Sequence, residues 1–257
     1  MKLIFRFTYL RILLSFMYPK KIPIFIPTFN NPTYLTNLLM QLSQFRNVLP
    51  IIIDNGSDFS KMVVLLQEIK SRGVFVLKAN QNPGPRFIIE NSYILRLLPK
   101  IFVLTDPDLE LKPGFRDKHL KVMKDITFEY KLGKVGLALE IKEPESIRKE
   151  KFLIGNKFFS ILDWESQFWL NPAEIQGCEA YLADIDTTFA VYNKKYFRST
   201  SIHSAIRIAS IFDQDVTAKH LPWYVKSIVP YSEREYYFQK CEGQRITNFG
   251  LGSSCTP

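Results

Sequence analysis

Apolar runs begin near residues 22, 48, 74 and 101, so they recur about every 26 residues, and a stretch with helical periodicity separates each run from the next. Short apolar runs bounded by turn residues are typical of buried strands. A strand, a helix and a second strand at this spacing form a βαβ unit, in which the two strands lie parallel. The sequence therefore predicts an α/β fold, with a mostly parallel sheet flanked by helices.

The predicted strands are Ile22–Ile26, Val48–Ile53, Val74–Leu77 and Ile101–Thr105. Asn31 and Pro32 mark the start of the first helix, and a helical segment is expected before the fourth strand, through Leu98. Beyond Pro113 the chain predicts a helix at Phe115–Tyr130 and strands at Lys134–Leu139 and Thr187–Tyr192. No repeat or linker divides the chain, so we expect a single domain with a less regular C-terminal region.

The fourth strand ends in a polar turn that contains Asp106, Pro107 and Asp108. Two carboxylates at the carboxyl end of a buried strand suit a hard divalent cation such as Mn²⁺ or Mg²⁺, which in turn can hold a diphosphate. Two other pairs share this spacing, Asp184/Asp186 and Asp213/Asp215, but neither follows a strand of the regular series. A simple turn or helix cap is the alternative for the first pair, because Asp-Pro starts turns.

Four segments, PTFN, IDNGSD, NQNPG and VLTDPD, follow one another along the first half of the chain. In this order they resemble the nucleotide-binding half of family 2-like glycosyltransferases with the GT-A fold. The resemblance implies a GT-A domain at residues 22–257, with a nucleotide-sugar half at 22–111 and an acceptor half at 112–257. It also implies an enzyme that transfers a hexosyl or pentosyl group from a nucleotide sugar to a hydroxyl of a glycan or glycolipid acceptor.

The resemblance also implies roles for the residues in these segments. Pro27, Thr28 and Asn30 would line the nucleoside pocket. Asp54, with Asn55 beside it, would accept a hydrogen bond from the base, most simply from the N3–H of uracil, so the expected donor is a UDP-sugar. Asp106 and Asp108 would face the diphosphate and the Mn²⁺ or Mg²⁺ ion.

Three further residues are candidates for the same site. Gly84 and Arg86 open a helical segment, where a guanidinium can grip a phosphate; a surface arginine is the alternative. His220, in the segment HLPWY, resembles the late histidine that completes the metal shell in several GT-A enzymes, and packing against its aromatic neighbours is the alternative. Lys226 is placed to neutralise the leaving diphosphate.

The chain departs from the family where the catalytic base is expected, because it has no Glu-Asp pair after a glycine-rich GGF segment. An inverting transfer, which the resemblance favours, needs a carboxylate to take the proton of the acceptor hydroxyl. Asp186 is the first choice and Asp184 the second, since they precede the predicted strand Thr187–Tyr192. The remaining candidates are Asp213, Asp215, Glu179 and Glu165, and a retaining outcome stays open.

Four aromatic residues fall where the family builds its acceptor cleft: Trp164, Phe168, Trp169 and Trp223. Indole faces can stack on sugars, so these side chains would form an acceptor platform. Core packing is the alternative, because Phe168 and Trp169 lie at helical spacing from Glu165.

The net charge of +9 and the pI of about 9.3 indicate acidic partners, such as nucleotide phosphates or anionic lipids. Nucleic acid is disfavoured, because the chain has no arginine-rich run and no aromatic RNA-binding motif. The three cysteines, Cys178, Cys241 and Cys255, are odd in number and lack a C-x-x-C spacing. They indicate a reducing compartment, so we expect a cytoplasmic protein.

Residues 1–21 are rich in aromatic and aliphatic side chains but are interrupted by Arg6 and Arg11. No run approaches the roughly 20 apolar residues that cross a bilayer. Two interpretations remain: a segment that lies in the interface of a membrane, with its basic residues on anionic lipid, or an ordinary helix that covers the core.

Two functional alternatives also remain. A sugar nucleotidyltransferase usually carries a glycine-rich loop of the G-x-G-T-R type after its first strand, whereas this chain has PTFNNP. A catalytically silent protein that binds a nucleotide sugar would show the same donor motifs as an active glycosyltransferase.

Overall fold

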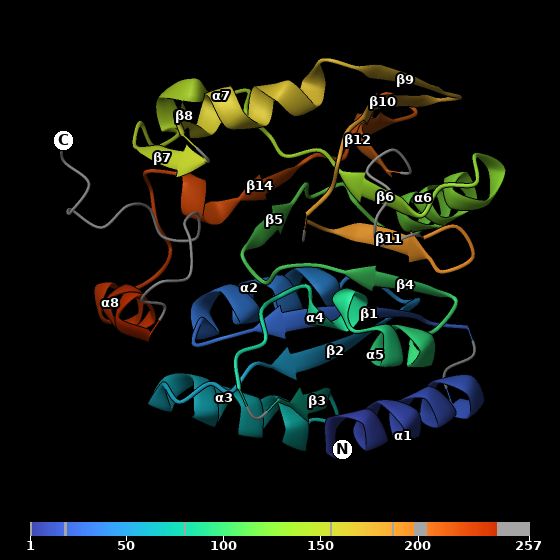
Figure 1. Ribbon diagram of the computed structural model, residues 1–257, viewed down its shortest axis with the longest axis vertical. Coiled ribbons are helices and arrows are strands. Elements are labelled where there is room, and N and C mark those ends of the chain that lie inside the picture. The colour runs from blue at the N-terminus through green and yellow to red at the C-terminus, as the bar shows by residue number, and fades with distance from the viewer. Residues whose placement is uncertain are drawn as a thin grey trace.

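One sheet of ten strands runs through the computed structural model (Figure 1). The structure describes residues 2–17, 20–79, 81–154, 156–186, 188–197 and 205–240. The first strands are β1 (Ile22–Thr28), β2 (Val48–Asp54), β3 (Phe75–Lys78) and β4 (Ile101–Leu104). They lie parallel in the order β3, β2, β1, β4, as the βαβ series predicts.

Helices cover both faces of these four strands (Figure 1). One face carries α2 (Pro32–Leu42) and α3 (Ser60–Ser71), with α6 (Asp117–Glu129) on the same face of the sheet but further along it, and the other carries α1 (Lys2–Met17), α4 (Phe87–Glu90) and α5 (Ser92–Leu97). The helical segment predicted before the fourth strand is split in two. The side-chain oxygen of Asn91 accepts hydrogen bonds from the backbone N–H groups of Tyr93 and Ile94, and so begins a new helix.

The second half of the sheet is mixed. Its strands are β6 (Lys134–Leu137), β9 (Pro172–Ile175), β10 (Cys178–Leu182), β11 (Ala190–Asn193), β12 (Ala205–Ile211) and β13 (Gln214–Asp215). β11 lies antiparallel between β4 and β6 and joins the two halves. It begins later than the predicted Thr187–Tyr192, whose first residue lies outside the described residues, as do Asn80, Cys241 and Cys255.

Two small ribbons stand outside the main sheet. β7 (Lys151–Ile154) and β8 (Lys157–Ser160) form a hairpin before α7 (Ile161–Ser166) and the short helix η2 (Gln167–Trp169). β5 (Leu109–Leu111) pairs with β14 (Ala218–His220), which leads into η4 (Leu221–Trp223) and, after an irregular stretch, α8 (Tyr231–Lys240). The second ribbon places His220 opposite Leu109, so two distant segments of the chain meet beside the Asp-x-Asp turn.

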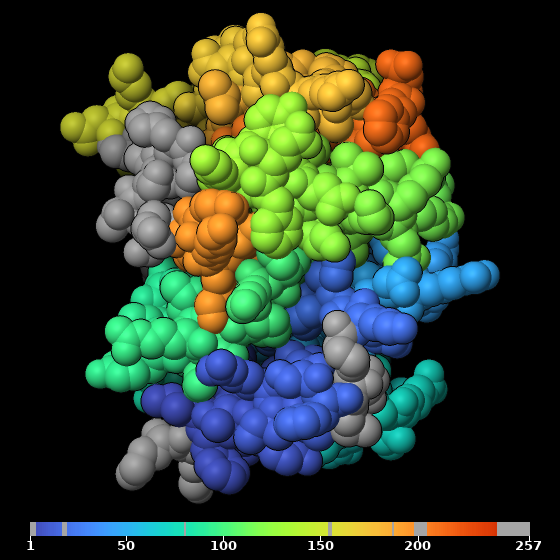
Figure 2. Space-filling view, turned by 90° about the vertical axis from the view of Figure 1, so that its right-hand side faces the viewer, coloured from blue at the N-terminus to red at the C-terminus, as the bar shows by residue number. Residues whose placement is uncertain are grey.

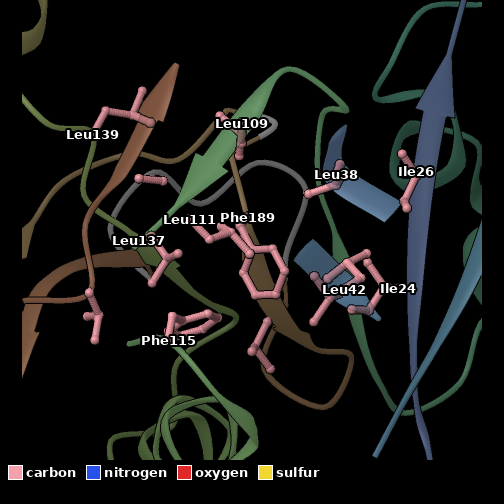
Figure 3. Packing of buried hydrophobic residues seen from close by; sticks show 14 of the residues in the cluster. Ile24, Ile26, Leu38, Leu42, Leu109, Leu111, Phe115, Leu137, Leu139 and Phe189 are labelled. Carbon is pink, nitrogen blue, oxygen red and sulfur yellow. The ribbon is translucent and has the colours of Figure 1, made fainter. Parts of the chain in front are cut away.

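The larger core cluster connects the two halves of the sheet (Figure 3). It joins Leu38 of α2 and Ile24 of β1 to Leu109 of β5, Leu137 of β6 and Phe115, which precedes α6. All five side chains are buried. The turn that holds Asp106 and Asp108 is therefore backed by continuous packing.

The N-terminal helix α1 covers the opposite face of the sheet. Its residues Phe7, Leu10 and Leu14 are buried in the second core cluster, so the docking interpretation holds for this side of the helix. Its outer side exposes apolar residues. In the part of the chain that the structure describes, no helix combines the length and the apolar character needed to cross a membrane.

The packing predicts a large difference between two neighbouring positions of α2. Leu38→Ala removes a fully buried side chain, and we expect the free energy of unfolding to fall by about 2–5 kcal/mol. Met40→Ala is the matched control, because Met40 is 67% exposed on the same helix, and its effect should stay within about 0.5 kcal/mol. Urea denaturation of the two variants measures both; equal losses would contradict this description of the core.

Candidate functional site

The carboxyl ends of β1, β2 and β4 meet at one edge of the sheet. Thr28 ends β1, Asp54 ends β2, and Asp106 follows β4. Ligands of open α/β sheets bind beyond the carboxyl ends of the strands. This edge, with the polar segments that the sequence singled out, is therefore the candidate functional site.

Asp54 is almost completely buried, but only one of its two carboxylate oxygens accepts a close hydrogen bond. Its Oδ1 accepts a hydrogen bond from the backbone N–H of Ser57 at 2.8 Å, whereas its Oδ2 lies 4.0 Å from the ammonium of Lys78. A cavity of about 550 Å³ lies between α1, α3 and β3, and Asp54 and Ser57 contribute to its lining. This is a size typical of small-molecule pockets.

Asn30 holds the loops after β1 and β2 together. Its φ of 50° lies in the left-handed region, which asparagine tolerates better than most residues. Its side-chain oxygen accepts hydrogen bonds from the N–H groups of Asp58 and Phe59, and its amide nitrogen donates to the carboxylate of Asp58. Its side chain is thus already bonded within the protein. Beside it, Thr28 donates its hydroxyl to the side chain of Asn31, and Pro27 is buried within β1.

The NQNPG loop, which was predicted to bind the nucleotide-sugar donor, lies next to Asn55. The amide of Asn55 donates to the backbone carbonyl of Gly84 at 3.2 Å, and Gly84 has a φ of +88°, which favours glycine. Two residues later, Arg86 pairs with Glu90 and, through Nη1, with Asp186 at 3.1 Å. The loop therefore reaches from the end of β2 to the expected base.

Helix α8 packs against the same loops from outside. Thr33, in the first turn of α2, donates both its N–H and its hydroxyl to the carboxylate of Glu233. Lys240 pairs with Asp58 at 2.6 Å, and Tyr236 stacks near Phe59. The C-terminal helix thus fixes the loops after β1 and β2.

Asp108 and His220 form a buried pair. The Nε2 of His220 lies 3.4 Å from the Oδ2 of Asp108, and the ring of Trp223 packs edge-on against the imidazole at 4.7 Å between centroids. Among the described residues, no hydrogen-bond partner is present for Asp108 Oδ1, His220 Nδ1 or Trp223 Nε1. Buried polar atoms without partners are rare and costly, so this cluster has the character of a binding site.

Asp106 lies on the other side of the turn, near Tyr192 of β11. Burial raises the pKa of Tyr192, and the carboxylates of Asp186, Asp106 and Asp184 add to this shift. The three carboxylates therefore all act electrostatically on this buried hydroxyl. Asp186 is 69% exposed and held by Arg86, whereas Asp184 pairs with Lys134 and accepts the N–H of Ile185.

A buried ion pair lies behind these acids. Arg207 of β12 donates through Nη1 to Glu165 of α7 and through Nε to the backbone carbonyl of Asp184. Burial raises the pKa of Glu165 to about 7, although the Arg207 guanidinium opposes the shift. The sequence analysis missed Arg207; its signal was a single arginine in the otherwise apolar run AIRIASI.

Most of the aromatic side chains that were predicted to form an acceptor platform pack against other side chains of the protein. The ring of Phe168 lies 3.9 Å from the guanidinium carbon of Arg207, and Trp164 makes edge contacts with three phenylalanine rings. Trp169 packs on Tyr181. Lys226 is exposed on the segment after η4.

The side-chain oxygen and nitrogen atoms near the Asp-x-Asp turn suit a cation that takes two or three protein ligands. Among the described residues, no three His, Cys, Asp or Glu side chains cluster closely enough to form a complete metal site. Asp108 and His220 nevertheless offer one oxygen and one nitrogen without a protein partner. Mg²⁺ and similar ions commonly take only one or two carboxylates and complete their shell with substrate phosphates and water, so these residues fit such an ion.

No protein-family model matches the chain, and no curated protein matches it. Several solved structures match in shape. TarS 1–349 of S. aureus has a TM-score of 0.42 and 14% identity, over 76% of this chain and 59% of that one. The mannosyltransferase PcManGT from Pyrobaculum calidifontis, in complex with GDP-Man and Mn²⁺, has a TM-score of 0.48 and 10% identity, over 94% and 69%. GalNAc-T7 with UDP, GalNAc and Mn²⁺ has a TM-score of 0.48 and 11% identity, over 84% and 47%.

These neighbours are glycosyltransferases of the GT-A type, the class that the sequence motifs resemble. At such identities the likeness concerns the arrangement of the chain alone.

Glu165 predicts a specific dependence of stability on pH. Its pKa is raised from 4.5 to about 7, so between these values the folded protein keeps a proton that the unfolded chain releases. The free energy of unfolding should therefore fall as pH rises through this window, by roughly 2–3 kcal/mol relative to Glu165→Gln, which cannot titrate. Urea denaturation near pH 5 and near pH 8 measures it. Glu174→Gln, at an exposed glutamate, should keep the wild-type slope; equal slopes for wild type and Glu165→Gln would refute the assignment.

Proposed function

We propose that the protein is a metal-dependent glycosyltransferase that moves a sugar from a nucleotide sugar, in the first place a UDP-sugar, to a hydroxyl of an acceptor. The observation that carries the proposal is the buried pair Asp108–His220, whose unpartnered atoms lie in the turn and ribbon that follow the carboxyl end of β4. The order of the motifs along the chain supports it independently.

The chain's own residues can hold the nucleoside part of the donor. The Oδ2 of Asp54 is the oxygen that we assign to the N3–H of uracil, because the N–H of Ser57 holds Oδ1 and the only ion-pair partner of Oδ2 among the described residues is the Lys78 ammonium, at 4.0 Å. The loop through Gly84 and Asn55 lies beside it, and Thr28 ends the neighbouring strand. Asn30 contributes by fixing these loops, since its side chain is already bonded to them.

Asp108, His220 and Asp106 are the residues that would hold a Mn²⁺ or Mg²⁺ ion. When bound, such an ion neutralises the charge that develops on a leaving diphosphate. The neighbours solved with Mn²⁺ agree with a divalent cation. Lys226 and Arg86 are the cations of the chain that we assign to the phosphates of the donor.

We assign the general base of an inverting transfer to Asp186. Its carboxylate is exposed to an incoming hydroxyl, and Arg86 fixes its position at 3.1 Å. Asp184 is the second choice, but its side chain already contacts Lys134 and the N–H of Ile185. Glu165 is buried and bonded to Arg207, so we assign it to support of the loop before β11.

Two other functions remain as rivals. A sugar nucleotidyltransferase would form a nucleotide sugar from a nucleoside triphosphate and a sugar phosphate, and a silent binding protein would hold the donor without turnover. Mass spectrometry of reactions with a panel of UDP-sugars and glycan acceptors separates them. Diphosphate release in a parallel reaction with UTP and a sugar 1-phosphate would favour the first rival, and donor binding without any product would favour the second.

The acceptor that we propose is a glycan or a glycolipid used in glycan biosynthesis. The transfer would take place in the cytoplasm, and at a membrane surface if the glycan is lipid-linked. The exposed face of α1 supports contact with a membrane.

The metal assignment predicts the behaviour of UDP. Asp108→Asn and His220→Ala should each weaken UDP binding in the presence of Mn²⁺ by about 10- to 100-fold, because each removes a ligand atom. Asp213→Asn is the control, since Asp213 belongs to an Asp-x-Asp pair elsewhere and is exposed. Calorimetric titration with and without Mn²⁺ measures the effect. Unchanged affinity in both site variants would exclude the proposed cation site.

The base assignment predicts a separation between binding and turnover. Asp186→Asn keeps the shape of the side chain but cannot accept the acceptor proton, so we expect kcat to fall by about 10²- to 10⁴-fold while UDP affinity changes little. For Asp184→Asn we expect a much smaller decrease in kcat. If the order of the two effects is reversed, Asp184 is the base instead.

A further inference from the structure

Helix α1 carries apolar side chains on two opposite sides. Phe7, Leu10 and Leu14 pack into the core, whereas the outer side exposes four large apolar residues at i, i+4, i+7 and i+11: Phe5 (74%), Tyr9 (59%), Ile12 (53%) and Phe16 (81%). This spacing places all four in one stripe on one side of the helix, opposite the residues that pack into the core, and Phe5 and Tyr9 also border the cavity between α1, α3 and β3. A helix that is apolar all round is normally buried all round, so the outer stripe lacks its partner in the free protein.

Basic residues flank this stripe on both sides. Arg6 donates to the backbone carbonyl of Lys78, at the edge strand β3, and the Lys78 side chain is 61% exposed. On the other side, Arg11 is exposed on α1, and Lys194 donates to the backbone carbonyls of Arg96 and Leu98, at the end of α5. The stripe is therefore bordered by positive charge.

The helix α1 and the segments that lie above it contain no acidic residue, whereas α3, which borders the same cavity as α1, carries Glu68. Figure 2 shows α1 lying across one face of the molecule, below α5 and the turn after β11. α1, α5 and residues 193–197 of that turn carry Arg96, Lys194 and Lys195 among their basic residues, and no Asp or Glu. The charge of this face is complementary to a negatively charged surface.

We propose that α1 is a membrane-docking helix that lies flat on a bilayer containing anionic phospholipid, with Phe5, Tyr9, Ile12 and Phe16 among the headgroups and acyl chains. The proposal deepens the proposed function, because it names the surface through which the protein would reach a lipid-linked acceptor. Aromatic and aliphatic side chains bordered by arginine and lysine are typical of helices that lie in the interface. α1 has 16 residues, so its role is to lie on the membrane rather than to cross it.

The polar residues of the helix fit this environment as well. The hydroxyls of Thr8 and Ser15 donate to the backbone carbonyls of Ile4 and Arg11, one turn earlier in the same helix. These hydroxyls therefore keep a hydrogen bond when water is displaced. The tip of Tyr9 can reach water or headgroups while its ring is buried.

Cosedimentation of the full chain with vesicles tests the proposal. We expect binding to phosphatidylcholine vesicles that contain phosphatidylglycerol and little binding to phosphatidylcholine alone. Ile12→Ser/Phe16→Ser should reduce binding at least tenfold, and neither residue lines the cavity that Asp54 reaches. Arg11→Gln should reduce it about fivefold, the ratio expected for the loss of one cation near an anionic surface.

Phe158→Ser is the matched control, because Phe158 is 67% exposed on β8, at the opposite end of the molecule in Figure 1. It should bind vesicles as the wild type does. Equal binding by the Ile12/Phe16 variant would overturn the proposal, as would failure of the wild type to bind anionic vesicles. A dimer that the same variant dissociates would assign the stripe to a second copy of the chain. UDP affinity, measured on the same samples, should be unchanged, so failure of the membrane proposal and failure of the glycosyltransferase proposal are separate results.

Discussion

The candidate site depends on how β5 is held. This three-residue strand pairs with β14 on one side, in a register that sets His220 opposite Leu109. On its other side, the amide of Gln41 in α2 donates to the carbonyl of Leu109 and accepts the N–H of Leu111. The backbone N–H of Leu221 also donates to the carbonyl of Asp108 at 2.9 Å. Backbone bonds therefore fix Asp108 and His220 relative to each other before any side-chain interaction between them is counted.

This arrangement explains why the Asp108–His220 pair can remain incompletely bonded in a folded protein. Leaving a buried carboxylate oxygen without a partner costs free energy, on the order of 1–3 kcal/mol, and the cost must be offset elsewhere. Leu109 and Leu111 project into the larger core cluster, and the ribbon supplies the backbone bonds. The free-energy cost of the unpartnered atoms is therefore offset by packing that does not depend on a ligand. A preorganised binding site requires this.

The sequence predicted the parallel half of the sheet because each signal there is local. Apolar runs, Pro32 at a helix start and Gly73 after a helix depend only on neighbouring residues. The pairing of β5 with β14 could not be predicted in this way, because it depends on which distant segments meet. The resemblance to a family suggested His220, and the register of the ribbon places it beside Asp108. Whether any of the predicted site residues, His220 and Asp108 included, binds a cation or a donor stays a prediction.

Arg207 shows what the sequence pattern hides. Inside AIRIASI an arginine reads as an interruption of a strand, so the strand itself was not predicted. In the fold, Glu165 supplies the opposite charge and Phe168 covers the guanidinium, which makes the burial of Arg207 tolerable. From the sequence, Glu165 was a candidate base and Phe168 a candidate for the acceptor platform, and neither was paired with an arginine. Neither the strand nor the role of Glu165 can be recognised until the two segments are placed together.

The sequence of the N-terminal helix is ambiguous for a different reason, because it contains two apolar stripes. The stripe of Phe7, Leu10 and Leu14 and the stripe of Phe5, Tyr9, Ile12 and Phe16 lie on opposite sides, so their helical periodicities cancel and the segment resembles a uniformly apolar run. From sequence, docking on the core and lying on a membrane were therefore competing interpretations. The structure makes them compatible: the core needs only one stripe, and the amount of apolar surface left on the other exceeds what docking requires. Because the two stripes share no residue, substitutions in the outer one can change a surface interaction without disturbing the fold.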